Sequence, residues 1–395
     1  MNIRFRSTHF RPYAIPALVF VTGAALTACA DNPAIPGADV PEMGNATPVP
    51  SSTQVDASAL VGEVIARPEF NEVSDMAVAG KNLALRMPDS LWLGTVDELA
   101  DAGSVIDIAA ECGELTATEQ HFILACGDSL QVIPAGEAKA ERIAPKVDFP
   151  ITAATRMNNG DLVVASEKSA EVAMVAPTGE VISRFTAAAP TDQLVHVESK
   201  SHGEQLVRTW REDTTIQNLD WRNERGGGTL RVGLGVGEIA VGDEGLVLAT
   251  DARGEQLAVY TALDVIRLHQ TVPAPAGPWA VAWDSERDVA WTASTKENLL
   301  TAFRISSGVP QQAGQLKTIP DAQSLVVADD GTVVLASATG HGIQVITEPE
   351  LSNSELYFPN NPRRTDNHGT RVSASTENHA SRGHEFPIDR VQQGL

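Results

Sequence analysis

Five acidic residues in this sequence could act together on a cation or a proton. Each lies beside the start of a strand-like run: Asp75, Glu111, Asp192, Glu238 and Asp321. Carboxylates that converge attract a divalent cation, or raise one another's pKa enough to retain a proton. The alternative is a coincidence of solvated residues, because Asp and Glu make up 51 of the 395 residues and favour turns. Chemistry at these positions therefore depends on a fold that brings them together.

Two cysteines have a spacing that suits a disulfide. Glu119 lies in a polar turn, and Cys112 and Cys126 lie seven residues before and after it. In an antiparallel hairpin with this centre the two residues face each other, with Cβ atoms about 4.5–5.5 Å apart, close to the separation that a disulfide needs. We expect a disulfide, with two free buried thiols as the alternative. The acidic residues on either side argue against a reactive thiolate.

Other motifs point to no reaction. The run Gly233-x-Gly235-x-Gly237 lacks the last spacing and the helix of a dinucleotide loop, so turns or a bulge explain it better. Zinc spacing, calcium-loop spacing and a nucleophile elbow are absent from the sequence. Trp279 and Trp283 alternate with Val281, so their indoles can stack a sugar or a flat cofactor, or pack between elements of the core.

The N-terminus has the layout of an exported, anchored protein. Residues 1–28 contain three arginines, no acidic residue and an apolar run of 13 residues, which is too short for a good membrane span. The run ends in Leu26-Thr27-Ala28-Cys29, which resembles the lipobox of bacterial lipoproteins. That resemblance implies cleavage before Cys29, lipidation of its thiol, and a location on the outer, extracytoplasmic face of the cell membrane.

Composition divides the rest of the chain. Residues 29–59 hold five prolines and no basic or aromatic residue, which predicts a lipidated tether that lifts the body from the membrane. Residues 60–347 form the body, and residues 348–395 are polar and predict a largely disordered tail. The net charge is −22, and −25 once residues 1–28 are removed. Such a charge repels nucleic acid, so a nucleic-acid partner is excluded.

The body repeats itself. Strand-like runs that follow a polar turn recur at intervals of 39 to 44 residues. Their anchors are Leu83, Phe122, Leu162, Leu206, Leu246, Val289 and Val333. Seven units of this length match the blades of a β-propeller, which are four-stranded sheets arranged around a central channel. A two-sheet sandwich or two smaller β domains are the alternatives. We therefore predict an all-β, seven-bladed β-propeller.

The third unit illustrates the expected blade, with strands at 153–156, 162–166, 172–176 and 181–185. The last unit supplies only three strands, near 323–328, 332–337 and 342–347. The segment Leu60–Arg67, which precedes the first unit, can supply the fourth. This closure would join the two ends of the body and cover the strand edges that otherwise promote aggregation.

The same strand register predicts where the five carboxylates lie in the fold. Inner strands would start near Asp75, Glu111, Thr152, Asp192, Glu238, Pro278 and Asp321, at one mouth of the channel. A divalent cation could bind at this mouth, as a metal does in the sugar-lactonase family of propellers. No other cofactor is predicted. A register shift of one residue would disperse the ring.

The lipobox, the Pro-rich tether and the seven β units together resemble secreted propeller lipoproteins of actinobacteria, the prolipoprotein LppL-like group of mycobacteria and corynebacteria. That resemblance implies an envelope protein and supplies no catalytic residue. We therefore expect a non-catalytic module that binds or scaffolds an envelope protein or glycan. The alternative is a metal-dependent hydrolase that acts on a sugar or lactone at the acidic mouth.

Overall fold

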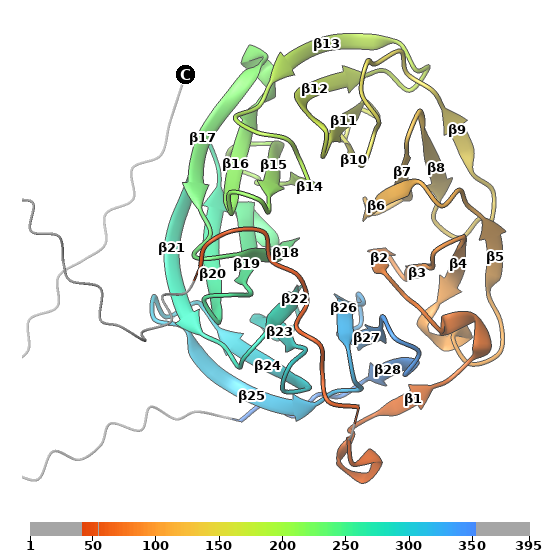
Figure 1. Cartoon of the computed structure of the whole chain (residues 1–395), viewed down its shortest axis with the longest axis vertical. Helices are drawn as coiled ribbons and strands as arrows, with labels where there is room; N and C mark the ends of the chain where they lie inside the picture. Colours follow the sequence, from red (N-terminus) through yellow and green to blue (C-terminus); the bar gives the residue numbers. More distant parts are fainter. Residues whose placement is uncertain (1–41, 54, 353–395) are drawn as a thin grey trace, which may run out of the picture. The chain divides into compact units, whose positions relative to one another are not determined.

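The computed structural model describes residues 42–53 and 55–352. In this part of the chain 28 β-strands form seven four-stranded antiparallel sheets, and the sheets are arranged as a ring (Figure 1). The protein is therefore an all-β, seven-bladed β-propeller, as the repeat spacing predicts. The predicted signal segment 1–28, the predicted lipidation site Cys29 and most of the predicted 348–395 tail lie outside the described residues. None of the helices in the described ranges has the length and apolar character to cross a membrane.

The blades follow one another in chain order, and each begins with its inner strand. Blade 1 contains β2 (Asp75–Ala79), β3 (Asn82–Arg86), β4 (Ser90–Thr95) and β5 (Ser104–Asp107), and blade 2 contains β6 (Cys112–Ala117), β7 (His121–Cys126), β8 (Ser129–Pro134) and β9 (Glu141–Ile143). Blade 3 contains β10 (Ala153–Arg156), β11 (Leu162–Ser166), β12 (Ser169–Val175) and β13 (Val181–Thr186), and blade 4 contains β14 (Gln193–Val197), β15 (Gln205–Trp210), β16 (Thr215–Asp220) and β17 (Arg225–Arg231).

The remaining three blades repeat this plan. Blade 5 contains β18 (Val236–Val241), β19 (Leu246–Asp251), β20 (Gln256–Ala262) and β21 (Ile266–Pro273), and blade 6 contains β22 (Pro278–Asp284), β23 (Val289–Ser294), β24 (Leu299–Arg304) and β25 (Gln311–Lys317). Blade 7 contains β26 (Ala322–Val327), β27 (Val333–Ser337), β28 (Ile343–Ile346) and β1 (Glu63–Ile65). Short 3-10 turns lie at Ala57–Ala59, Pro68–Phe70, Val96–Glu98, Trp221–Asn223 and Asp243–Gly245.

The second strand of each blade is mostly buried because both of its faces are covered. All five residues of β11 are buried, whereas the outer strand β13 has half-buried or exposed residues at five of its six positions. A strand covered on both faces becomes a continuous apolar run, and one covered on a single face alternates. All seven sequence anchors fall in second strands for this reason.

The apolar core is divided among the contacts between neighbouring blades. One cluster joins Ile123 and Leu130 of blade 2 to Val164 and Val175 of blade 3. Another joins Leu85 and Trp92 of blade 1 to the last blade. Each blade is therefore stabilised by its neighbours, and the ring needs all of its members.

The ring closes as predicted. β1 pairs antiparallel with β28, with Glu63 opposite Val345 and Ile65 opposite Ile343. The last blade thus takes three strands from the end of the propeller and one from its beginning. The free edge of β28 is covered by this pairing.

Residues 42–53, which we call the strap, lie along the propeller instead of forming part of a free tether. Figure 1 shows the strap in red-orange as it crosses blades 5 and 6 on its way to β1. Ala46 is 2% exposed, and the amide of Gly44 donates to the carbonyl of Leu234 at 3.0 Å. At the far end the Asn298 side chain donates to the carbonyl of Ser52 at 2.8 Å. The strap is extended and contains proline, but its backbone still offers donors and acceptors. The loops of these blades form hydrogen bonds with those groups.

The propeller also continues past the predicted boundary at residue 347. Contacts within the chain place the end of this compact unit at Ser352. The hydroxyl of Ser352 donates to the carbonyl of Ala313 at 2.7 Å, and Leu351 packs on the apolar cluster between the last two blades. The first five residues of the predicted tail therefore belong to the folded body.

Candidate functional site

A cavity of about 270 Å³ opens where the inner strands begin, and we call it the mouth. Its charged lining consists of Asp75, Arg86, Glu114, Asp192, Arg211 and Glu238. Three of the five acidic residues selected from the sequence therefore come together, namely Asp75, Asp192 and Glu238. Glu114 adds a fourth carboxylate that the sequence analysis did not select.

Two of the five selected residues lie elsewhere. Glu111 is exposed and does not line the mouth. Asp321 is buried under the strap, where its carboxylate accepts from the amide of Ser51 at 3.1 Å and from the hydroxyl of Thr339 at 2.8 Å. Its role is to hold the strap and a neighbouring turn. The expected ring of five is thus a group of four with a different membership.

A β-bulge aims Glu114 at the mouth, whereas Glu111 lies before β6 begins. Cys112 faces Cys126, and Leu115 faces Leu124, so Gly113 and Glu114 together oppose one residue of the next strand. Because an extra residue re-aims the side chains beside it, the bulge places Glu114 at the mouth. The simple hairpin register, which treats the strand as regular, misses this.

Blade 5 contains the same kind of bulge. Val236 faces Asp251 and Ile239 faces Ala249, so Gly237 and Glu238 oppose the single residue Thr250. A Cβ on Gly237 would lie 2.5 Å from the Thr250 hydroxyl, and one on Gly113 would lie 2.3 Å from the carbonyl oxygen of Thr152. Both bulges therefore require glycine. The recurring pair Gly-Glu, between apolar residues at the start of an inner strand, is the sequence signal that identifies both carboxylates.

The four carboxylates are already bonded to the protein. Asp75 accepts from the amides of Met76 at 2.8 Å and of Leu115, in the next blade, at 2.9 Å. Glu114 reaches across blade 3 and accepts from the amide of Leu194 at 3.0 Å. Asp192 accepts from the amide of Arg211. These bonds fasten the inner strands to one another around the channel.

Arg211 supplies the positive charge among these acids. Its guanidinium donates to Glu238 at 2.7 Å and lies 5.4 Å from the ring centroid of Trp279. Burial alone would lower the pKa of Arg211, but the carboxylates of Glu238 and Asp192 raise it on balance. The mouth is thus a charged hydrogen-bond network with a fixed internal cation.

Burial changes the protonation of the acids. It raises the pKa of Asp75 to about 7, and the charge of Glu238 adds to this while the two backbone amides oppose it. Burial likewise raises the pKa of Glu114, Asp192 and Glu238. A desolvated carboxylate favours its neutral form. Near neutral pH the mouth therefore holds protons as well as charges.

The donor set does not suit a divalent cation. Within residues 42–53 and 55–352, no three or more His, Cys, Asp or Glu side chains are placed to hold a metal ion. Hard cations such as Ca²⁺ take six to eight oxygen ligands, whereas the mouth acids accept from backbone amides and from Arg211. The cation site considered from the sequence is therefore not supported by the residues present.

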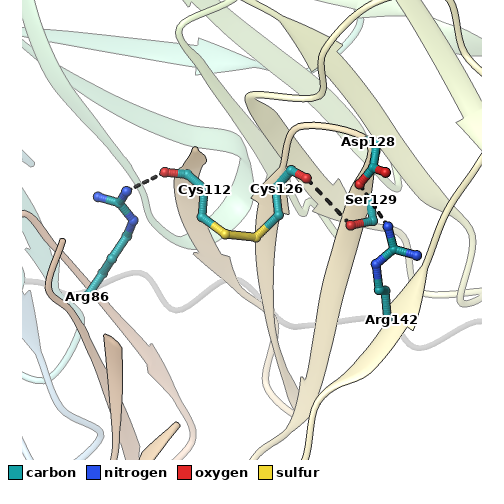
Figure 2. Close-up of a disulfide and its surroundings, with 6 residues drawn as sticks. All are labelled: Arg86, Cys112, Cys126, Asp128, Ser129 and Arg142. Carbon is teal, nitrogen blue, oxygen red and sulfur yellow. Dashed lines mark hydrogen bonds and ion pairs between the residues drawn. A yellow bond between two sulfur atoms is a disulfide. The ribbon is translucent and has the colours of Figure 1, made fainter. Parts of the chain in front are cut away.

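The predicted disulfide is present beside this network. Figure 2 shows Cys112 and Cys126 joined across β6 and β7, with Arg86 of blade 1 donating to the carbonyl of Cys112. Arg86 also donates to the hydroxyl of Ser74 at 2.6 Å. The disulfide fixes the strand on which the bulge and Glu114 lie, and Arg86 connects that strand to the preceding blade.

Below the mouth a cavity of about 290 Å³ is lined by the inner strands. Asp75, Glu114 and Glu238 of the mouth line it together with apolar side chains such as Val281 and Leu325. Trp279 and Trp283 do not form a joint stacking surface, because a bulge after Pro278 separates them. Trp279 packs between blades, whereas Trp283 lines the channel and its indole donates to Asp243. Packing explains the first of these indoles.

Solved structures that resemble the chain share its fold at low sequence identity. U3-55K is 12% identical with a TM-score of 0.60, over 76% of this chain and all of that one. The WD40 β-propeller domain of Doa1 is 13% identical with a TM-score of 0.54, over 75% and 97%. Hydrazine synthase of Kuenenia stuttgartiensis is 9% identical with a TM-score of 0.56, over 74% and 98%. No protein-family model and no curated protein sequence matches the chain.

Proposed function

We propose that this protein is a non-catalytic, protein-binding β-propeller of the cell envelope, held on the outer face of a membrane by lipidated Cys29. The proposal joins the lipobox-like sequence Leu26–Cys29 to the architecture of the body. It names one role for the whole chain, which is to present a rigid ring of loops to a partner.

The hydrogen bonding of the mouth residues supports the non-catalytic part of this proposal. Its carboxylates accept from backbone amides or from Arg211, so they serve as ties between strands. General acid–base catalysis needs a side chain that can reach a substrate proton, and a metal-dependent hydrolase needs a free donor set. In the mouth the carboxylates are engaged in bonds within the protein, and among the described residues no three of them are placed to hold a metal ion.

The comparisons agree with a binding role without choosing a partner. One similar structure is described as a WD40 domain and another is named as an enzyme. Because one fold hosts many functions, the choice rests on the site of this chain.

Charge indicates the chemistry of the partner. With a net charge of −22, the protein attracts a basic protein surface and repels an acidic one. The exposed Glu111, two residues before Gly113 of the mouth, offers a position from which to detect such a partner.

Site-specific photo-crosslinking in intact cells tests the binding role. A photoreactive residue replaces Glu111 in the full-length protein, and the matched control replaces Arg267, which is exposed on the outer strand β21. We expect one envelope protein to crosslink reproducibly from position 111 and not from position 267. Equal labelling at both positions, or no product at either, would contradict a partner at the mouth.

Fractionation of the same cells tests the anchor separately. The variant Cys29→Ser removes the thiol that would be acylated, and we expect it to leave the membrane fraction while the propeller remains folded. Retention of Cys29→Ser in the membrane fraction would refute the lipid anchor without bearing on the partner.

A further inference from the structure

Another cavity, of about 460 Å³, lies at the opposite end of the inner strands, and we call it the Arg156 cavity. Its lining comes from the turns after the inner strands of blades 2 and 3 and from the end of β14, and includes Gln120, His121, Arg156, Asn158, His196 and Glu198. On β14, Gln193 lines the mouth whereas His196 lines this cavity. Its volume falls within the range of small-molecule sites, roughly 300–1,000 Å³.

Arg156 is the unexplained group in this cavity. Among the residues that the structure describes, the half-buried side chain of Arg156 makes no hydrogen bond, ion pair or ring contact, and its Nη1 atom is buried without a partner. Other half-buried arginines are bonded, as Arg287 is to Asp284 at 2.9 Å. The Arg156 side chain lines the cavity, so its guanidinium is positioned to donate to a ligand oxygen placed there.

The groups around Arg156 are mainly donors. Burial lowers the pKa of His121, and the charge of Arg156 lowers it further, so the imidazole is neutral near pH 7 and offers one N–H. Nε2 of His196 lies 3.0 Å from a carboxylate oxygen of Glu204 and makes no hydrogen bond. The amide side chain of Asn158 adds two donors.

Two acidic residues line the cavity, and the half-buried Glu204 lies beside it, where it accepts from the amide of Asn158 at 2.6 Å. Glu119 and Glu198 are both exposed, so solvent and salt screen their charges. The half-buried Arg156 is screened less. Locally, therefore, this cavity favours an anion although the protein as a whole is strongly acidic.

We propose that the Arg156 cavity binds a small oxyanion, the carboxylate or phosphate group of a small molecule, through the guanidinium of Arg156. The planar guanidinium donates two parallel N–H bonds to such a group, and His121 and Asn158 donate to its remaining oxygens or to neighbouring hydroxyls. This inference does not depend on the proposed function, because it concerns the other end of the channel and needs neither the anchor nor a protein partner.

Titration of the purified protein with three probes tests the site. Inorganic phosphate, D-glucuronate and uncharged D-glucose are added at pH 7 in physiological salt, and backbone amide NMR shifts and calorimetry are recorded. We expect one or both anions to bind and to shift the amides of Asn158 and Gly160, with glucose at least tenfold weaker. The stronger anion identifies the source of the oxyanion.

Matched variants separate the site from general electrostatics. Arg156→Gln is expected to weaken anion binding at least tenfold, Arg156→Lys by less, and Arg142→Gln, at an exposed ion pair with Asp128, by less than twofold. His121→Ala supplies a second test if Arg156→Gln does not fold. The proposal is overturned if neither anion shifts these amides, if glucose binds as well as glucuronate, or if the Arg156 and Arg142 variants lose binding equally.

Discussion

At the scale of single residues, the acidic side chains of the mouth accept hydrogen bonds that connect neighbouring strands. Glu114 and Glu238 each follow a glycine in a bulge, and each is aimed at the channel by that bulge. Their partners are the amide of Leu194 and the guanidinium of Arg211. Hydrogen bonds to charged groups contribute more than neutral ones, but desolvation of the carboxylates opposes them. The balance of these two effects depends on pH.

Stability is therefore expected to fall as pH rises from about 4 to about 7. Burial raises the pKa of Asp75 to about 7 in the folded protein, while an unfolded aspartate has a pKa of about 4. Between these values the folded state holds a proton that the unfolded chain has lost, so the free energy of unfolding decreases with pH. The raised pKa values of Glu114, Asp192 and Glu238 act in the same direction.

Asp75→Asn removes one of these titrations. We expect the loss of stability between pH 4 and pH 7 to become smaller by roughly 2–4 kcal/mol, at about 1.4 kcal/mol per pKa unit. Urea unfolding at several pH values measures this. The control is Asp128→Asn, at an exposed residue whose pKa is lowered by hydrogen bonds from Ser129 and Arg142. An unchanged pH profile in Asp75→Asn would show that Asp75 does not carry a proton in the fold.

At the scale of elements, the sequence predicts the strands well and their irregularities poorly. The third blade was expected at 153–156 and 162–166 for its first two strands, and β10 and β11 have those bounds. Buried runs and polar turns define such strands locally. The bulge at Gly113 depends on the close approach of Thr152 from the next blade, which a local pattern does not contain.

The difference between local sequence pattern and contacts between blades also explains which residues of the candidate site could be predicted. Asp75, Asp192 and Glu238 were selected by their position at the start of inner strands, and the ring places them together. Glu111 was selected by the same rule, but it lies before β6, and Glu114 inside the bulge of that strand lines the mouth instead. The Arg156 cavity was not selected, because an unpartnered arginine is visible only when its surroundings are known.

The hairpin of blade 2 is expected to depend on its disulfide. The bond closes a loop with a sequence separation of 14 residues, for which chain-entropy arguments give about 3 kcal/mol. We expect the double variant Cys112→Ala, Cys126→Ala to lose about that amount in denaturant unfolding. Reductant should destabilise the wild type similarly and leave the double variant unchanged. Equal responses to reductant in both proteins would contradict a stabilising disulfide.

At the scale of the whole molecule, ring closure makes the blades interdependent. β1 belongs to the start of the propeller but completes the last blade, and its pairing with β28 joins both ends. The strap adds contacts to the last three blades, through Leu234, Asn298 and Asp321. Opening the ring at β1 would expose the edge of β28 and weaken the core between the last blade and the first.

The variant Val64→Pro tests this closure at one backbone position. Val64 faces Gln344 in the centre of β1, and proline removes a donor and does not fit inside a paired strand. Because an uncovered strand edge recruits other chains, we expect a lower melting temperature and soluble aggregates, measured by calorimetry and light scattering. The matched control is Val64→Ala, which keeps the amide and loses only a side chain that is 39% exposed. It should remain monodisperse, and if it aggregated as Val64→Pro does, side-chain contacts rather than closure of the sheet would be holding the ring together.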